Sequence, residues 1–180
     1  MKILVAYASK HSSTKGIADF LGEKLKQKGN DVDVVEVKIG SDLGKYDAFV
    51  IGSAVYMGHW IKDAREFVSK NKNLLSRKPV WLFSSGPVGN EPKDKQGRDL
   101  REVSGPNEIN ELKEQARPRE HHVFFGTFDP KDLDFFSRQF FKSSAIRNAT
   151  PIGDFRDWKE IESWANSIAS ELQKMSMVAT

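Results

Sequence analysis

The feature that most constrains the fold is a set of short, continuously apolar segments. The first runs from Ile3 to Ala8 and stops at a polar cluster, residues 9–14. Because hydrophobicity here is continuous and does not alternate, we expect a strand that is covered on both faces, as in a parallel sheet. Further strands of this kind are expected at 32–37, 48–52, 79–83 and 122–128.

Helical patterns separate these segments. Ile17, Leu21 and Leu25 recur every four residues after the first strand, with charged residues mostly off that stripe. Strands that alternate with helices predict an α/β fold with a doubly wound parallel sheet, and we expect 1–175 to form one domain. The other expected helices are at 60–70, 106–116 and 157–174.

Composition removes several classes of protein. The chain has no cysteine, which excludes disulfides, thiolate nucleophiles and Cys-ligated metal centres. The net charge of +3 is too small to favour a nucleic-acid partner. No apolar run approaches the ~18 residues of a membrane helix, and the N-terminus lacks a secretory signal. We therefore expect a cytoplasmic protein that binds no nucleic acid.

Three of the expected strands end in loops of small and hydroxyl-bearing residues. In doubly wound sheets, ligands bind at the carboxyl ends of the strands, so these loops are expected to converge on one site. The candidate site residues are Ser9, Lys10, His11, Ser12, Ser13 and Thr14 in the first loop, Ser53, Ala54, Val55, Tyr56, Met57, Gly58 and His59 in the second, and Ser84, Ser85, Gly86, Pro87, Val88 and Gly89 in the third.

The first loop opens the first expected helix. Unpaired N–H groups at a helix N-terminus attract anions, and hydroxyls add donors without bulk, so a phosphate monoester suits this loop. The glycine fingerprints of dinucleotide and triphosphate sites are absent. The alternative interpretation is that Ser12 or Ser13 only caps the helix.

These loops also carry a family resemblance. Residues 7–14 followed by a helix resemble the phosphate loop of the flavodoxin family, 51–60 its loop beside the isoalloxazine ring, and 84–89 its third loop, while 153–158 is also typical of it. Within that family, the chain most resembles the branch of flavodoxin-like menaquinone-dependent protoporphyrinogen oxidases and their uncharacterised relatives. The resemblance implies FMN as cofactor, a five-stranded parallel sheet in the order 2-1-3-4-5, and an insertion at 129–153 after strand five.

Aromatic and histidine side chains in the second loop have two interpretations each. Tyr56 either stacks on the flavin or packs in the core, and stacking is expected; Met57 is expected to pack on the flavin. Trp60 is expected to pack within the first turn of the following helix. His59 lies near the ring or on the surface, and no catalytic residue is assigned.

Two other histidines are adjacent on the fifth expected strand. His121 and His122 should point to opposite faces, since side chains alternate along a strand. They cannot hold a metal jointly, and we expect no metal site.

Charge in the ring-flanking loops bears on function. Segments 52–59 and 84–89 contain no Asp or Glu, so negative charge on a reduced flavin should be less disfavoured than in acidic flavodoxins. We expect an FMN-dependent oxidoreductase with a small organic electron acceptor such as a quinone, a protoporphyrinogen-oxidase-like activity being one version. The alternatives are an electron-transfer protein that serves a protein partner, and a member that has lost its cofactor. The hydroxyls of the first loop argue against the second alternative.

Segment 129–153 breaks the alternating pattern. Its phenylalanines are too many for one helical stripe, and basic residues lie among them. Four roles stay open, namely packing into the core, contact with an anionic membrane surface through 131–147, a homodimer interface, and a cover over the flavin pocket. The residues concerned are Lys131, Phe135, Phe136, Arg138, Phe140, Phe141, Lys142 and Arg147.

Overall fold

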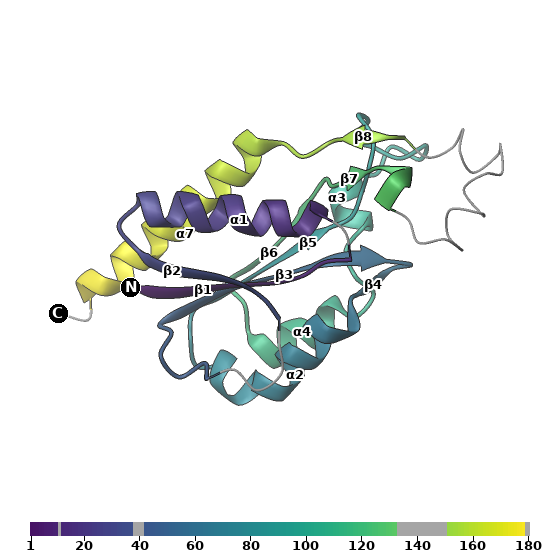
Figure 1. Ribbon diagram of the computed structural model, residues 1–180. Helices are drawn as coiled ribbons and strands as arrows, with labels where there is room; N and C mark the ends of the chain where they lie inside the picture. Colours follow the sequence, from purple (N-terminus) through teal and green to yellow (C-terminus); the bar gives the residue numbers. More distant parts are fainter. Residues whose placement is uncertain (11, 38–41, 133–150, 179–180) are drawn as a thin grey trace.

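A central parallel sheet organises the computed structural model, which describes residues 1–10, 12–37, 42–132 and 151–178. The sheet order is β2-β1-β3-β5-β6 (Figure 1), which is the expected 2-1-3-4-5 when the parallel strands alone are counted. The fold prediction is therefore confirmed. The strands are β1 (Lys2–Ala8), β2 (Asp31–Glu36), β3 (Ala48–Tyr56), β5 (Val80–Ser85) and β6 (Glu120–Phe124).

Helices cover both faces of this sheet, which explains the continuous apolar runs. Helices α1 (Ser12–Gln27) and α7 (Trp158–Val178) lie on one face, and α2 (Lys62–Leu75) and α4 (Ile109–Ala116) on the other (Figure 1). Along β1, alternate residues enter two separate cores: Ile3 packs with α1 and α7, and Leu4 with α2 and α4. All residues from Ile3 to Ala8 are at most 8% exposed.

The region around Trp60 differs from expectation. The helix begins at Lys62, while His59 and Trp60 form a short strand, β4, that pairs antiparallel with the end of β3. Two residues with positive φ, Met57 (49°) and Gly58 (79°), reverse the chain between them. A glycine in a two-residue hairpin turn allows this reversal, so the prediction of a first-turn helical Trp60 is wrong. Trp60 is instead a core residue, 1% exposed.

The fifth expected strand is also interrupted. Strand β6 ends at Phe124, and Thr127–Phe128 form β7, which pairs antiparallel with β8 (Gly153–Asp154). Gly126 separates the two strands, its N–H donating to the Pro87 carbonyl and its own carbonyl accepting from Phe155. The last helix ends at Val178, beyond the predicted end at residue 174.

The proposed insertion is described only at its edges. Residues 130–132 form a 3-10 turn, and β8 begins at Gly153, the last residue of the segment. The four phenylalanines and the basic residues beyond Lys131 lie outside the described residues, as does His11.

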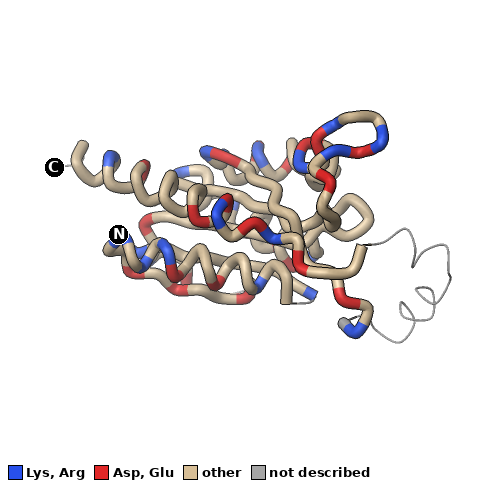
Figure 2. Tube along the Cα trace, turned by 90° about the horizontal axis from the view of Figure 1, so that it is seen from above, with Lys and Arg blue, Asp and Glu red and all other residues tan. Residues whose placement is uncertain are grey.

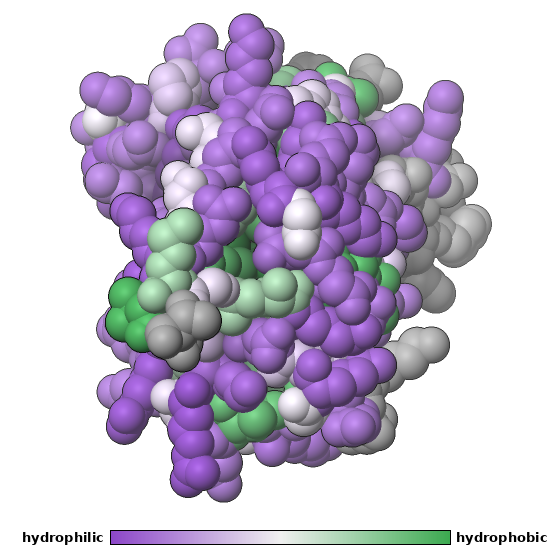
Figure 3. Space-filling model, turned by 90° about the vertical axis from the view of Figure 1, so that its left-hand side faces the viewer, coloured by the Kyte–Doolittle hydropathy of each residue, from purple (hydrophilic) through white to green (hydrophobic). Residues whose placement is uncertain are grey.

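The two ends of the sheet differ in character. Both termini lie at one end (Figure 1), and Figure 3 shows that this face is largely hydrophilic with a small apolar area. Three exposed apolar residues near the termini are Met1, Met177 and Val178. The predicted loops lie at the opposite end. Within the described ranges, no helix combines the length and the apolar character needed to cross a bilayer.

Candidate functional site

A cavity of about 170 Å³ lies at the carboxyl ends of the central strands, where the three predicted loops meet. A fourth segment, 126–129, closes it and was not predicted as part of the site. The lining residues are Ser9, Ser13, Thr14, Ala54, Val55, Tyr56, Ser85, Gly86, Val88, Gly126, Thr127, Phe128 and Asp129.

Thr14 is the buried polar group that most clearly points to a ligand. It is 0% exposed in the first turn of α1, and it lines the cavity. Its Oγ1 has no hydrogen-bond partner among the described residues. Buried hydroxyls are rarely left unpaired, because each unmade hydrogen bond costs about 1–3 kcal/mol. An acceptor with several oxygens, placed at the start of α1, would satisfy this hydroxyl together with the unpaired N–H groups of the helix.

Ser13 connects three walls of the cavity. Its Oγ lies 3.1 Å from Ser85 Oγ and accepts a hydrogen bond from the Thr127 N–H at 3.0 Å. A Cβ added at Gly126 would lie 3.0 Å from Ser13 Oγ and 3.1 Å from Ser85 Oγ, so any larger residue would have to displace these two hydroxyls slightly. Ser13 therefore fixes the fourth segment against the first and third loops. A glycine two residues after the end of a strand, Gly126, was the sequence signal for this close approach.

The remaining residues of the first loop lie at its outer side. Ser12 is exposed at the start of α1. Lys10 extends over the second loop, with its Nζ 5.0 Å from the centre of the Tyr56 ring. This cation–π contact links the two loops at the edge of the cavity.

Two predicted serines point away from the cavity. Ser53 Oγ accepts the Ile61 N–H at 3.0 Å and donates to the Ala54 carbonyl. Ser84 Oγ accepts the indole N–H of Trp60 at 2.7 Å and lies 2.8 Å from Nε2 of His121. Both serines are fully buried, so in this structure their hydroxyls hold β4 and β6 in place.

The tip of the second loop projects outward. Tyr56 is 37% exposed at the cavity, and Met57 is 98% exposed beside it. His59 is directed toward α4, with Nδ1 2.8 Å from Glu108 Oε2. In the third loop, buried Pro87 bonds Gly126 through its carbonyl, while Gly89 has φ of 121°.

Charge around the cavity is sparse. Among the described lining residues, Asp129 alone is charged; it is exposed and its Oδ1 accepts the Lys131 N–H at 2.9 Å. The second and third loops lack carboxylates, as noted from the sequence, but the unpredicted fourth segment supplies one. Asp129 therefore places a negative charge at the cavity that the sequences of these two loops did not predict.

His121 and His122 do face opposite sides of the sheet. His121 lies near Ser84, while His122 packs on Trp164 with ring centres 5.6 Å apart. Burial, followed by the nearby charges of Lys113 and His122, lowers the pKa of His121 to about 4. His121 is therefore neutral near pH 7, and its Nε2 can accept a hydrogen bond from the Ser84 hydroxyl. In the described ranges, no group of three or more His, Asp and Glu side chains is arranged to hold a metal.

Comparisons with known proteins identify relatives in sequence and in structure. A family model described as a flavodoxin domain matches residues 4–150. The protein named protoporphyrinogen IX dehydrogenase [quinone] from Escherichia coli strain K12 is 30% identical over 95 residues, 52% of this chain and 52% of that protein. The protein of the same name from E. coli O157:H7 matches to the same extent. The alignments thus span about half the length of these curated relatives.

Solved flavodoxin structures superpose over nearly the whole chain. A flavodoxin from the domain Archaea matches with a TM-score of 0.56 and 18% identity, covering 96% of this chain and 99% of that one. Oxidised flavodoxin 2 from Bacillus cereus gives 0.59 and 21%, covering 95% and 99%. Rubredoxin oxygen:oxidoreductase from Desulfovibrio gigas gives 0.58 and 14%, covering 96% of this chain and 36% of that one.

At these identities the structural matches establish the fold, and the family model adds membership because it matches most of the sequence. The cofactor that this membership implies is FMN, and a cavity with an unpaired buried hydroxyl at the start of α1 fits its phosphate. The chain belongs to the flavodoxin domain family.

Proposed function

We propose that this chain is an FMN-dependent oxidoreductase that passes electrons from a reduced donor to a small organic acceptor, with quinones as the favoured class. The observation that carries the proposal is the cavity itself. It offers Thr14 and the α1 N-terminus to an anion, and most of its wall is apolar.

The proposed roles of the lining residues follow from their chemistry. Thr14, Ser12 and the first N–H groups of α1 would hold the phosphate. Tyr56 and Val88 would contact the ring system, and the small residues Ala54 and Gly86 leave room for backbone groups to approach its polar edges. When bound, FMN supplies the electron transfer, and the protein supplies binding, orientation and electrostatics.

The size of the cavity bears on the acceptor. At about 170 Å³ it is smaller than the ~300–1,000 Å³ typical of sites that enclose a whole ligand. A cofactor would therefore be enclosed only in part, with the remainder accessible beside Tyr56 and Met57. An exposed apolar thioether at this edge suits a flat organic acceptor better than a hydrated ion.

Two further observations favour a small acceptor over a protein partner. The name of the E. coli relatives includes a quinone, although they align over only half their length. In addition, Figure 2 shows Lys and Arg interspersed with Asp and Glu along the described trace, without a region of one sign. Electron carriers that dock on a protein partner rely on complementary charged faces.

The test is turnover by the purified, FMN-loaded protein under anaerobic conditions, with a water-soluble quinone as acceptor and protoporphyrinogen IX or a reduced nicotinamide as donor. We expect a yellow protein that releases FMN on denaturation and reduces the quinone catalytically. A colourless protein that cannot be loaded would refute the cofactor assignment. Two widely separated one-electron potentials without quinone turnover would favour the carrier alternative.

A further inference from the structure

A carboxylate from a distant part of the chain contacts the hairpin formed by β3 and β4. Glu108, just before α4, accepts the backbone N–H of Trp60 through Oε1 at 2.9 Å. Its Oε2 lies 2.8 Å from Nδ1 of His59, 49 residues away in sequence. The Arg65 guanidinium on α2 lies 3.6 Å from Oε1. The Glu108 side chain is only 11% exposed, so its carboxylate is largely enclosed by these three contacts.

The residue before it supports the same turn through its backbone. The Asn107 N–H donates to the Gly58 carbonyl at 2.7 Å. Gly58 has φ of 79°, and a Cβ there would lie 2.8 Å from the Asn107 side-chain nitrogen. Backbone in this region persists when surrounding contacts determine it. Residues 107 and 108 supply such contacts for the turn that carries Tyr56 and Met57.

We infer that Glu108 is a positioning residue for the FMN site, which fixes the β3–β4 turn beside the cavity without lining the cavity itself. The inference rests on the proposed function. The path is short: Glu108 holds His59 and Trp60, these pair with Tyr56 and Val55 in the β3–β4 hairpin, and both of those residues line the cavity.

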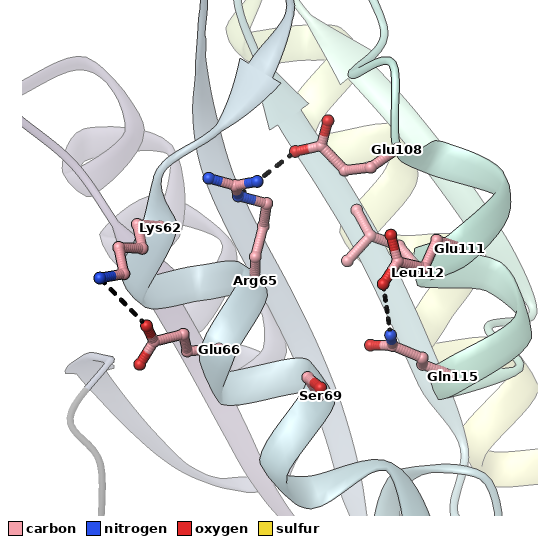
Figure 4. A pocket seen from close by; sticks show the side chains of 8 residues that line it. All are labelled: Lys62, Arg65, Glu66, Ser69, Glu108, Glu111, Leu112 and Gln115. Atoms are coloured by element: carbon pink, nitrogen blue, oxygen red, sulfur yellow. Dashed lines mark hydrogen bonds and ion pairs between the residues drawn. The ribbon is translucent and has the colours of Figure 1, made fainter.

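The charge of Glu108 is balanced on the side away from the turn. Figure 4 shows it at one end of a groove between α2 and α4, with the Arg65 side chain reaching toward it. Burial opposes the charged form of Glu108, but hydrogen bonds from its own backbone N–H, from His59 and from Trp60 hold its pKa below the ordinary value. The carboxylate is therefore ionised near neutral pH, and its hydrogen bonds are the stronger, charge-assisted kind.

The same groove offers a matched control. Glu111 lies one turn further along α4 and also lines the groove, but it is exposed and accepts a hydrogen bond from Gln115 at 2.9 Å (Figure 4). Replacing Glu111 removes the same charge from the same helix and leaves the contacts of Glu108 with the turn in place.

The experiment compares Glu108→Ala, Glu108→Gln and Glu111→Ala with the parent chain. It measures the FMN dissociation constant by fluorescence quenching, the midpoint potential of bound FMN, and the unfolding temperature. We expect Glu108→Ala to weaken FMN binding about tenfold or more and to shift the potential, because charge-assisted hydrogen bonds are lost. Glu111→Ala should stay within about twofold of the parent.

Each result decides between positioning and plain stabilisation. A Glu108→Ala protein with a lower unfolding temperature but the parent's FMN affinity and potential would overturn the inference. If that variant does not fold, Glu108→Gln decides the question, because it keeps an acceptor for Trp60 and loses only the charge facing His59 and Arg65. It should change affinity in the same direction by a smaller factor, and parent-like binding and potential would again overturn the inference. A parent chain that binds no FMN would refute the proposed function and this inference with it, whereas a parent that binds normally keeps the two failures separate.

Discussion

The first loop and the β3–β4 turn follow neighbouring buried strands and contribute to the same cavity, yet they are supported in different ways. At the cavity, the first loop is held by hydroxyl and backbone groups, since Ser13 Oγ bonds Ser85 Oγ and the Thr127 N–H. The β3–β4 turn is held by titratable side chains, with Glu108 on one side of the hairpin and the Trp60–Ser84–His121 chain on the other. The support of the first loop should not depend on pH, whereas the support of the β3–β4 turn should.

The largest expected effect concerns the first loop. Ser12→Asp adds a negative charge at the start of α1, where it would oppose a phosphate. Each lost donor to a charged group is worth about 1.5–3 kcal/mol, so FMN affinity should fall roughly 10–100-fold or more. The fold should survive, because an acidic residue at a helix N-terminus is favourable.

An FMN fluorescence titration of the apoprotein measures this effect. Ser12→Asn is the matched control, because Asn is similar in size to Asp but uncharged. It should retain most of the FMN affinity. Replacement of buried Thr14 by Asp should also weaken FMN binding, but with a loss of stability that Ser12→Asp avoids. Parent-like binding by Ser12→Asp would mean that the phosphate lies elsewhere.

The next effect tests whether the hairpin support depends on pH. Burial lowers the folded pKa of His121 to about 4, below its ordinary value of 6.5. The unfolded chain therefore binds a proton that the folded chain rejects, so this group reduces stability as pH falls from 6.5 toward 4, and by at most roughly 3 kcal/mol. Above pH 6.5 it has no such effect.

Urea unfolding at several pH values measures the slope. His121→Gln removes the titrating group, so its free energy of unfolding should decline less steeply between pH 6.5 and 4 than that of the parent. The slopes are compared, because the substitution also alters the bond to Ser84. Parallel curves for the two proteins would show that His121 does not titrate in this way.

The same contrast explains what could be predicted from the sequence. The strands, their parallel arrangement and the first loop depend on continuous apolar runs and on hydroxyls next to a helix start, which are local patterns. The order of the strands followed instead from the family resemblance. The support of the second loop depends on Glu108, which lies in a stretch of mixed charge that resembles an ordinary solvated surface. Nothing local marks that carboxylate, since its role exists only once α4 packs beside α2.

Local chain reversals were the second source of error. The turn at Met57 and Gly58 and the break at Gly126 each redirect the backbone within a few residues. An apolar pattern continues across both points, so periodicity extended the helix back to Trp60 and the fifth strand on to Phe128. Gly58 has a positive φ that favours glycine, and a Cβ at Gly126 would lie tightly against Ser13, a residue far away in sequence.

A smaller effect would sharpen the description of the first loop. Ser13→Ala leaves the Thr127 N–H and the Ser85 hydroxyl without their shared partner, so the free energy of unfolding should fall by about 1–2 kcal/mol. The loss should be the same at pH 5 and pH 8, in contrast to His121. Ser12→Ala, at an exposed position, should change stability by less than about 0.5 kcal/mol. Equal losses for the two variants would count against a pinning role for Ser13.

The smallest effect concerns the fourth segment, residues 126–129, in which Asp129 lines the same cavity as the first loop and the β3–β4 turn. A negative charge near bound FMN disfavours the addition of electrons, so Asp129→Asn should raise its midpoint potential. Val88→Asp, which places a carboxylate in the third loop, should lower the potential. Because Asp129 is exposed and screened by salt, the first shift should be on the order of tens of millivolts and should shrink at high ionic strength.

A dye-coupled redox titration of the FMN-loaded protein distinguishes position from net charge. Glu23→Gln changes the net charge equally on the exposed side of α1, away from the cavity lining, and should leave the potential unchanged. If Asp129→Asn and Glu23→Gln gave the same shift, the fourth segment would have no special access to the cofactor. A shift confined to Asp129 and Val88 would instead mean that the potential is set by the cavity's walls, and that a single unpredicted carboxylate offsets part of what the two carboxylate-free loops contribute.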